Sequence, residues 1–279
     1  MLTIVMPMGG DAKRFAEKGY TFPKPLVEIV GRPMVEIVVQ NVAPSEAHGF
    51  VFICRQDHIE RFALADVLRL VAPECRIVPI TGQTAGALCS VLLAMEFVGQ
   101  DDELLVANAD QVIDATTDAF LNDARRRDAD GAMVTFPSTH PKWSYARLEG
   151  DRVVAVAEKR PISVHATAGL YYFRRGGDFL AAAEAMILKN AALHNEFYVC
   201  PVYNELILAG KKVVVYPITR EQMHSLGTPE DVERFAAGYL PGSDPSLRNA
   251  LARIACADTA NADAAGGRDT RQGLGSVNS

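Results

Sequence analysis

Short runs of consecutive apolar residues alternate along the first half of the chain with longer segments whose apolar positions recur at helical spacing. The short runs predict buried strands, and they are Leu2–Met6, Gly49–Cys54, Arg76–Ile80, Glu103–Ala107 and Ala132–Phe136. The longer segments predict helices, and they are Pro33–Val42, His58–Val71, Ala85–Phe97 and Thr116–Arg127. Strands that alternate with helices predict an α/β fold with a mixed, mostly parallel sheet covered on both faces.

The rhythm changes after Pro137, where three strand-like segments follow one another with only short turns. These segments are Tyr145–Leu148, Val153–Glu158 and Ala166–Phe173. Strands joined by a turn such as Glu149-Gly150-Asp151 pair antiparallel, so we expect a small antiparallel insertion beside the main sheet. Two helices, a last strand and a last helix are then predicted at Asp178–Lys189, Val199–Leu208, Lys212–Tyr216 and Pro229–Ala237.

Apolar content falls from Pro241 onward, and the composition shifts toward Ala, Gly, Asp and Asn. Such a segment buries too little apolar surface to offset the conformational entropy of folding. We therefore expect one folded domain over residues 1–240 and a largely disordered C-terminal tail over residues 241–279, in which Leu247–Ala255 could form one short helix.

The first strand runs into a glycine pair, Gly9-Gly10, and cations follow at Lys13, Arg14 and Lys24. Adjacent glycines let the backbone approach a bulky group and take positive φ. Backbone N–H groups at such a turn can cradle an anion, while cationic side chains neutralise its charge. The glycine pair alone is more often a plain surface turn, because neither G-x-G-x-x-G nor a P-loop is present.

The stretch from Gly9 to Met34 reads G-G-x-x-x-R-F, then K-G-Y-x-x-P-K-P-L, then G-x-P-M. It resembles the signature of the nucleotidyltransferases that make activated sugars and related headgroups. The resemblance implies their nucleotide-diphospho-sugar transferase fold, a Rossmann-like three-layer sandwich. In that family the loop arginine and the lysine of P-K-P-L contact the nucleoside triphosphate, which assigns these roles to Arg14 and Lys24. The loop departs from the family at Asp11 or Ala12, where a second glycine is usual.

A second turn, Gln83 to Ala87, follows the third strand and opens a helix. Its glycine permits close approach of a flat ligand and a glutamine amide can read a base edge, but a plain strand-to-helix turn is an equally good interpretation. The turn resembles the base-binding segment of the same family. By resemblance the nucleotide-binding residues are Met8, Gly9, Gly10, Arg14, Gln83, Gly86 and Ala87.

Asp110 stands just after the fourth strand, and ligands of open α/β sheets bind outside the carboxyl ends of strands. A carboxylate beside a triphosphate suits Mg²⁺, which prefers oxygen ligands, whereas a strand-end aspartate is as often only a helix cap. The resemblance favours the metal, because the family's aspartate at this point coordinates the cation. Many members carry a second aspartate where this chain has Ser225. Glu196 is one candidate for the missing ligand, so the predicted Mg²⁺ ligands are Asp110 and Glu196.

Glu158-Lys159 ends a strand of the antiparallel insertion. An acid beside a base is usually a solvated pair that contributes little. The family has E-K-P here, with the glutamate on the acceptor and the lysine on its phosphate. Its T-x-G-x-Y-x-F strand also matches, and the glycine would let the acceptor lie against the backbone. By resemblance the acceptor-binding residues are Asn108, Glu158, Lys159 and Gly169, and the catalytic residues are Arg14, Lys24, Asp110 and Lys159.

The implied reaction is in-line attack of a phosphate monoester on the α-phosphorus of a nucleoside triphosphate, with pyrophosphate leaving. The second pKa of such a monoester is near ~6, so no general base is needed. The segments P-K-W-S-Y, E-K-x-P-I-S and N-E-F-Y look closest to the branch encoded with capsule and surface-polysaccharide genes, which includes phosphoglutamine cytidylyltransferase. The base (CTP, UTP or dTTP) and the acceptor stay open.

Composition further limits the classes of partner that the protein can have. The net charge of −6 and a pI of about 5.6 argue against nucleic acid or an anionic membrane as the main partner. Five cysteines without a C-x-x-C pair, and a start that enters the first strand without a basic segment, favour a reduced, cytoplasmic protein. The sequence leaves the oligomeric state open, and a homo-oligomer is compatible with it.

Two other classes of function stay open at this point. A glycosyltransferase that consumes a nucleotide sugar would need a D-x-D-like metal site, whereas this chain has Asp110-Gln111-Val112. A catalytically silent nucleotide-binding or regulatory protein is compatible with Ser225. Zinc and serine hydrolases have no support, because neither H-E-x-x-H nor G-x-S-x-G occurs.

Overall fold

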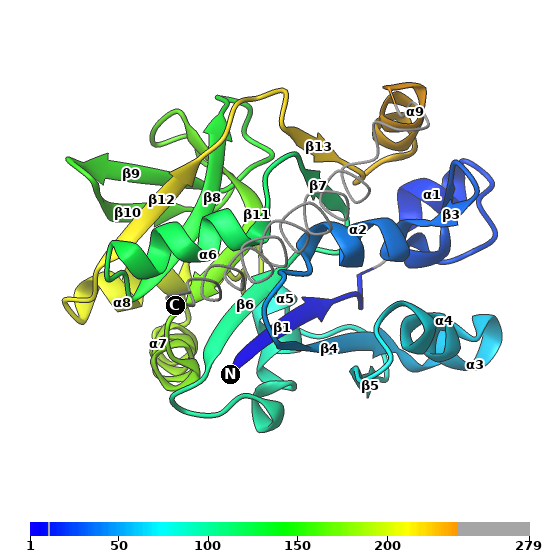
Figure 1. The fold of residues 1–279 in the computed structure, drawn as a ribbon, viewed down its shortest axis with the longest axis horizontal. Helices are drawn as coiled ribbons and strands as arrows, with labels where there is room; N and C mark the ends of the chain where they lie inside the picture. Colours follow the sequence, from blue (N-terminus) through cyan, green and yellow to red (C-terminus); the bar gives the residue numbers. More distant parts are fainter. Residues whose placement is uncertain (11, 239–279) are drawn as a thin grey trace, which may run out of the picture.

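A single large sheet organises the protein, whose computed structural model describes residues 1–10 and 12–238. The strand order is β10-β9-β11-β6-β1-β4-β5, and β8 pairs with both β11 and β12 (Figure 1). The strands are β1 (Leu2–Pro7), β4 (His48–Arg55), β5 (Arg76–Ile80), β6 (Glu103–Ala107), β8 (Gly131–Pro137), β9 (Tyr145–Glu149), β10 (Arg152–Ala157), β11 (His165–Phe173) and β12 (Val213–Pro217).

Pairing directions confirm a mixed, mostly parallel sheet with an antiparallel part. β1 pairs in parallel with β4 and β6, β4 with β5, and β8 with β12. β11 runs antiparallel to β6, β8 and β9. The predicted turn at Gly150 closes the β9–β10 hairpin, and Gly150 takes φ +60° there. This hairpin extends the edge of the main sheet.

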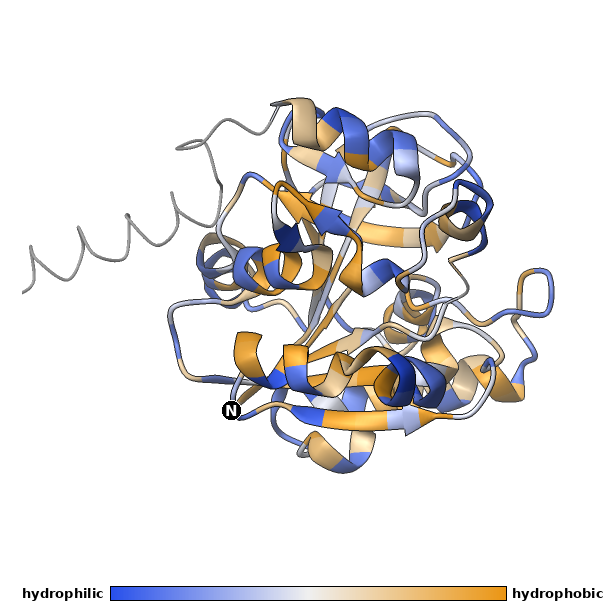
Figure 2. Ribbon diagram, turned by 90° about the vertical axis from the view of Figure 1, so that its right-hand side faces the viewer, coloured by the Kyte–Doolittle hydropathy of each residue, from blue (hydrophilic) through white to orange (hydrophobic). Residues whose placement is uncertain are grey.

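Helices cover both faces of the sheet, as the alternation of elements predicts. Ile4 and Met6 of β1 enter one core, while Val5 enters the other, because successive side chains of a strand point to opposite faces. The first core holds buried residues of α2 (Met34–Val42), α4 (Leu64–Val71), α6 (Thr117–Arg126) and α9 (Pro229–Gly238). The second holds those of α5 (Ala87–Leu92), α7 (Gly176–Leu188) and α8 (Val202–Leu208). Figure 2 shows the apolar strands between helices that carry hydrophilic residues.

Two predicted helices are each divided in the structure. The segment His58–Val71 contains α3 (Gln56–Phe62) and α4, separated at Ala63, whose φ of 50° interrupts the helix. The single-helix prediction is wrong because the left-handed Ala63 ends α3 and lets α4 start in a new direction, and only α4 has buried residues, among them Leu64 and Leu68. The predicted helix Ala85–Phe97 likewise consists of α5 and a short 3₁₀ turn, η2 (Met95–Phe97).

Several short elements have no counterpart in the predictions because they are too brief to show periodicity. They are α1 (Lys13–Glu17), η1 (Lys24–Leu26), β2 (Glu28–Ile29), β3 (Arg32–Pro33), β7 (Gln111–Ile113) and β13 (Met223–Ser225). The expectation that Lys212–Tyr216 is the last strand is therefore wrong. β13 pairs antiparallel with β7 and sets Ser225 opposite Gln111. This pairing carries the segment after Ser225 next to Asp110.

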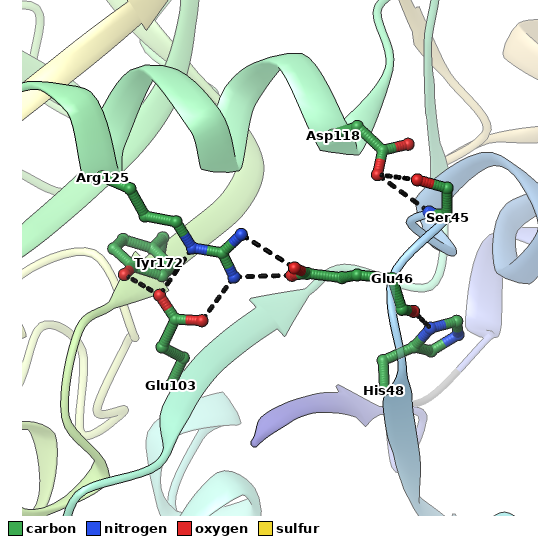
Figure 3. A network of polar contacts seen from close by, with 7 residues as sticks. All are labelled: Ser45, Glu46, His48, Glu103, Asp118, Arg125 and Tyr172. Carbon is green, nitrogen blue, oxygen red and sulfur yellow. Dashed lines mark hydrogen bonds and ion pairs between the residues drawn. The ribbon is translucent and has the colours of Figure 1, made fainter. Parts of the chain in front are cut away.

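An ion-pair network ties the sheet together at the end where β6 begins (Figure 3). Arg125 of α6 donates to Glu103 at the start of β6, with Nε 2.8 Å from Oε1. The same guanidinium donates to Glu46, just before β4, at 2.6 and 2.9 Å. Tyr172 of β11 also donates to Glu103. The network joins elements from four parts of the chain, and Asp110 lies past the opposite end of β6.

Among residues 1–10 and 12–238, no helix is long and apolar enough to cross a membrane. The predicted disorder of residues 241–279 and the short helix at Leu247–Ala255 lie outside the described residues. Asp11, at the departure from the family's glycine loop, also lies outside them.

Candidate active site

A cleft of about 560 Å³ opens at the carboxyl ends of the parallel strands. Five segments contribute to it: the loop after β1, the η1 turn, the β5–α5 turn, the β6–β7 turn and the segment around residue 197. The lining includes Met8, Gly9, Gly10, Lys13, Lys24, Gln83, Gly86, Ala87, Asn108, Asp110, Glu196 and Tyr198. Most of the residues predicted to act on substrates therefore share one cavity.

Of the glycine pair after β1, Gly9 packs closely against another residue, whereas a Cβ at Gly10 would have no atom within 4 Å. Neither Gly9 nor Gly10 has a positive φ, so that expectation is wrong. A Cβ added at Gly9 would lie 2.5 Å from Cδ1 of Ile80 at the end of β5, so the missing side chain lets the loop after β1 pack against the Ile80 side chain. The N–H of Met8 continues the sheet by donating to the carbonyl of Ile53 at 2.8 Å. The loop is thereby held against the cleft.

Of the two cations that follow the glycines, Lys13 lines the cleft and Arg14 does not. Both lie on α1, whose buried anchor is Phe15. The Arg14 side chain is exposed beside the cleft-lining loop. A role for Arg14 in binding phosphate stays a prediction.

Lys24 and Asp110 are in direct contact across the cleft. Lys24 Nζ donates to Asp110 Oδ2 at 2.5 Å, and the two side chains are 23% and 30% exposed. Lys24 is fixed by the flanking prolines, since Pro23 and Pro25 set the 3₁₀ turn in which the Val27 N–H donates to the Lys24 carbonyl. Its ammonium also lies 5.7 Å from the Phe15 ring centroid. Two residues singled out in separate motifs thus form one charged pair.

The backbone of Asp110 is hydrogen-bonded to the segment that follows β13. The Leu226 N–H donates to the Asp110 carbonyl at 2.7 Å. A Cβ added at Gly227 would lie 3.3 Å from Ser225 Oγ and 3.6 Å from Asp110 Oδ2, so both side chains face one point. Ser225 Oγ in turn donates to Asp231 Oδ2 at 3.0 Å. Ser225 therefore lies near Asp110, and a second carboxylate, that of Asp231, has its Oδ2 3.9 Å from the same point.

Asp231 is a residue that the sequence interpretation missed. Its N–H donates to Thr228 Oγ1 at 3.2 Å at the start of α9, which reads in the sequence as an ordinary helix cap. Only the pairing of β7 with β13 shows that this cap borders the predicted metal site.

Gly86 in the β5–α5 turn meets protein where a ligand was expected. A Cβ there would lie 2.5 Å from the Phe197 carbonyl oxygen and 2.6 Å from its nitrogen, and Gly86 has φ +109°. Phe197 is pinned on both sides of Gly86, because its N–H donates to the Ala85 carbonyl at 2.8 Å and its carbonyl accepts from the Leu88 N–H at 3.0 Å. The glycine is required by this backbone crossing, and a nucleobase role for Gln83, Gly86 and Ala87 stays a prediction.

Lys159 is connected to the cleft by its contact with Tyr198, which lines it. Lys159 Nζ donates to the Tyr198 hydroxyl at 2.5 Å and lies 4.5 Å from the centroid of the same ring. The Tyr198 hydroxyl donates to Oε2 of Glu196. Partial burial works against the Lys159 charge, but the hydrogen bond to Tyr198 and the nearby carboxylates outweigh it and raise the pKa of Lys159. Tyr198 belongs to the N-E-F-Y segment of the resemblance, but no role is predicted for it from the sequence.

Glu158, which precedes Lys159, is partly buried. It accepts a hydrogen bond from Ser144 Oγ. Burial raises the pKa of Glu158, and the hydrogen bond from Ser144 offsets only part of that effect. Neither Glu158 nor Gly169 is among the described residues that line the cleft. Their roles in acceptor binding stay predictions.

The environment of Gly169 gives another reason for that glycine. A Cβ at this position, with φ +72°, would lie 1.8 Å from Gln111 Oε1 and 2.5 Å from Asn108 Nδ2. Asn108 is anchored there because its N–H donates to the Gly169 carbonyl at 2.9 Å. Gly169 therefore positions the end of β6, which carries Asn108 and Asp110 into the cleft.

The donor set suits a cation that takes few protein ligands. Within the described ranges, no three His, Cys, Asp or Glu side chains are grouped closely enough to form a complete metal site. Mg²⁺ usually binds through one or two carboxylates plus substrate phosphates and water. Asp110 and Glu196 line the same cleft and supply carboxylates of that kind.

The architecture and the position of the cleft define an α/β protein with the nucleotide-diphospho-sugar transferase fold. The profile of the nucleotidyl transferase family matches residues 2–223, and the chain belongs to that family. A comparison with curated proteins finds no match.

Solved structures of similar proteins agree with this assignment. A nucleoside-diphosphate-sugar pyrophosphorylase from Vibrio cholerae RC9 is 28% identical, with a TM-score of 0.73 over 84% of this chain and 99% of that one. A UDP-glucose pyrophosphorylase complexed with UDP-glucose is 15% identical, with a TM-score of 0.69 over 86% and 98%. The inositol-1-phosphate CTP transferase from T. maritima is 14% identical, with a TM-score of 0.66 over 82% and 90%. The last two show a shared fold.

Proposed function

We propose that this nucleotidyltransferase moves a nucleoside monophosphate from a nucleoside triphosphate to a phosphorylated small molecule and releases pyrophosphate, with Mg²⁺ as cofactor. The observation that carries the proposal is the contact between Lys24 and Asp110 in a cleft bounded by the glycine turn. A cation and a carboxylate side by side match the two needs of a metal-bound triphosphate. Arg14 and Lys159 are the further cations assigned to phosphates.

The mechanism follows from charge. The acceptor phosphate is mostly dianionic at neutral pH, since its second pKa is near ~6, and it attacks the α-phosphorus without a general base. The protein must hold two polyanions in line and neutralise the charge that develops. Lys24 would meet the triphosphate and Lys159 the acceptor phosphate. Asp110 and Glu196 would hold Mg²⁺ together with the triphosphate, and the ion supplies further charge neutralisation.

Substrate binding divides between the two sides of the cleft. The nucleotide side comprises Met8, Gly9, Gly10, Gln83, Gly86 and Ala87, all of which line the cavity. The acceptor side comprises Asn108, Glu158, Lys159 and Gly169. The acceptor is a sugar 1-phosphate or another phosphorylated small molecule, and the base is that of CTP, UTP or dTTP. We place the reaction in the cytoplasm, in the supply of precursors for a surface polysaccharide.

The experiment incubates the protein with Mg²⁺, each nucleoside triphosphate in turn and a panel of phosphorylated acceptors, and follows pyrophosphate. Pyrophosphate that forms only when triphosphate and acceptor are both present supports the proposal. Nucleoside diphosphate released from a nucleotide sugar would instead indicate a glycosyltransferase. Ser225, which replaces a carboxylate beside Asp110, is the observation that favours a silent nucleotide-binding protein. Bound nucleotide without turnover for any acceptor would establish that alternative.

A further inference from the structure

The segment that carries Glu196 and Tyr198 is a tight hairpin. Leu193 and Glu196 exchange backbone hydrogen bonds of 2.9 and 3.0 Å. The two residues between them, His194 and Asn195, have φ of 51° and 64°, as a two-residue hairpin turn with both central residues left-handed requires. Phe197 follows directly and is pinned against Gly86. The hairpin is therefore a rigid support anchored on the nucleotide side of the cleft.

From this support Tyr198 reaches across to the acceptor side. Its hydroxyl accepts from Lys159 Nζ at 2.5 Å and donates to Glu196. A hydroxyl has one proton and two lone pairs, so its donor is used on the carboxylate and a lone pair on the ammonium. Lys159 is itself held at φ 51°, an uncommon conformation for a residue with a side chain. Both partners are thus constrained to this one geometry.

The hydroxyl also separates two opposite charges. Without it, the Lys159 ammonium and the Glu196 carboxylate lie on either side of a single missing oxygen and can pair directly. A phosphate dianion displaces a neutral hydroxyl from an ammonium more readily than it displaces a carboxylate, because only the carboxylate competes with it in charge. An ammonium that donates one N–H hydrogen bond to Tyr198 keeps two N–H donors for phosphate.

We infer that Tyr198 is a positioning residue, which holds Lys159 at the acceptor side of the cleft and keeps it from pairing with Glu196. The inference rests on the proposed function, in which Lys159 binds the acceptor phosphate. Tyr198 acts on the acceptor through Lys159, although its hydroxyl also donates to Glu196, the second proposed Mg²⁺ ligand. Its removal therefore changes the use of the acceptor more than the binding of the triphosphate.

The test is the substitution Tyr198→Phe, which keeps the ring and removes only the oxygen. The kinetic constants for acceptor and triphosphate are measured separately, with glucose 1-phosphate as the first acceptor probe. We expect kcat/KM for the acceptor to fall about tenfold, the size of one hydrogen bond to a charged group, with a smaller change in KM for the triphosphate. Tyr216→Phe is the matched control, because Tyr216 packs on Phe120 and does not line the cleft.

A second background separates positioning from general damage. In the Lys159→Met variant, the further change Tyr198→Phe has no effect on kcat/KM for the acceptor if Tyr198 acts on the acceptor only through Lys159. An undiminished effect in that background, or an equal rise in KM for the triphosphate, would overturn the inference.

A structural measurement keeps the two proposals distinguishable. If the wild-type protein forms no pyrophosphate with any acceptor, the proposed function fails, and crystal structures of wild type and Tyr198→Phe decide the positioning role alone. We expect Lys159 Nζ to contact the Tyr198 hydroxyl in the wild type and to move to Glu196 in the variant. A Lys159 side chain that stays in place without the hydroxyl would refute the role.

Discussion

Lys24 Nζ lies 2.5 Å from Asp110 Oδ2, although the two residues are 86 positions apart in the chain. One comes from a proline-flanked turn after β1 and the other from the end of β6, and β1 and β6 are neighbours in the sheet. Adjacent parallel strands deliver their following loops to one edge, so the contact is a consequence of strand order. The pair sits where the proposed chemistry needs a cation and a metal ligand together.

Removing either member of this pair should abolish catalysis and spare the fold. We expect Lys24→Ala and Asp110→Ala each to lower pyrophosphate release by about 10³-fold or more, the size of a lost charge contact at a reaction centre. Both side chains are partly exposed, so the thermal unfolding midpoint should change little. Steady-state assays paired with thermal melts measure the two effects. Near-wild-type turnover in both variants would reject the assignment of the site.

Gly86→Ala should be far more damaging than Gly82→Ala, although both glycines belong to one turn and have positive φ. A methyl group at Gly86 would meet the Phe197 backbone at 2.5 Å, whereas a Cβ at Gly82 has no atom within 4 Å. We expect a loss of about 3 kcal/mol in the free energy of unfolding at Gly86 and about 1 kcal/mol at Gly82. Urea unfolding measures both, and equal losses would show that the backbone crossing is unimportant.

Arg125→Ala should destabilise the protein and leave the catalytic constants intact. The guanidinium serves Glu46 and Glu103 at the end of the sheet away from the cleft (Figure 3). Its loss leaves two partly buried carboxylates without their partner, which costs about 2 kcal/mol. Arg175→Ala, which breaks only the exposed pair with Asp101, is the control and should show no measurable change. A fall in kcat without a fall in stability would contradict this separation.

The same network predicts part of the response to acid. Burial alone would raise the pKa of Glu103, but hydrogen bonds from Arg125 and Tyr172 lower it below the ordinary value of 4.5. The unfolded chain therefore takes up the proton first. The stability that Glu103 contributes is present above about pH 4.5 and is lost as the pH falls through the lower folded value. Unfolding free energies between pH 7 and 3 should converge for wild type and Arg125→Ala, and a constant gap would refute the linkage.

Ser225→Asp tests whether the second metal position has kept its geometry. Ser225, Asp110 and Asp231 face one point, and Ser225 Oγ donates to Asp231. An added carboxylate should repel its neighbours and lower the melting temperature without metal, and Mg²⁺ should then raise it more than in the wild type. Ser225→Asn has nearly the same shape without the charge and serves as the control. The same Mg²⁺ response in Asp and Asn variants would show that no ion binds at this point.

Periodicity predicted most long elements because their core faces repeat over many residues. Val5 and Ile4 enter opposite cores, so β1 appears in the sequence as a run of consecutive apolar residues. Periodicity failed at Ala63, where a left-handed residue divides a segment that looks continuous. Elements of two to five residues, such as β13, have no period to detect.

The residues of the candidate site were likewise predicted only in part. Lys24 and Asp110 stand in recognisable motifs at strand ends, so their contact could be predicted. Tyr198 contacts Lys159, and Asp231 lies near Asp110 because β13 pairs with β7. Both arrangements form only when distant segments fold together. Gly86 and Gly169 were expected to let a ligand approach the backbone. In the structure, protein atoms lie where a side chain at either position would be. A glycine signals a close approach and does not say to what.

The fate of the α-phosphorus tests the central claim most directly. Wild-type protein is incubated with Mg²⁺, a phosphorylated acceptor and nucleoside triphosphate labelled with ³²P at the α or the γ position in parallel. The account predicts that α-label joins the acceptor in a nucleotide-linked product, that γ-label leaves as pyrophosphate, and that Lys24→Ala and Asp110→Ala do neither. Label that stays in unreacted triphosphate for every acceptor, or γ-label released as orthophosphate, would contradict it.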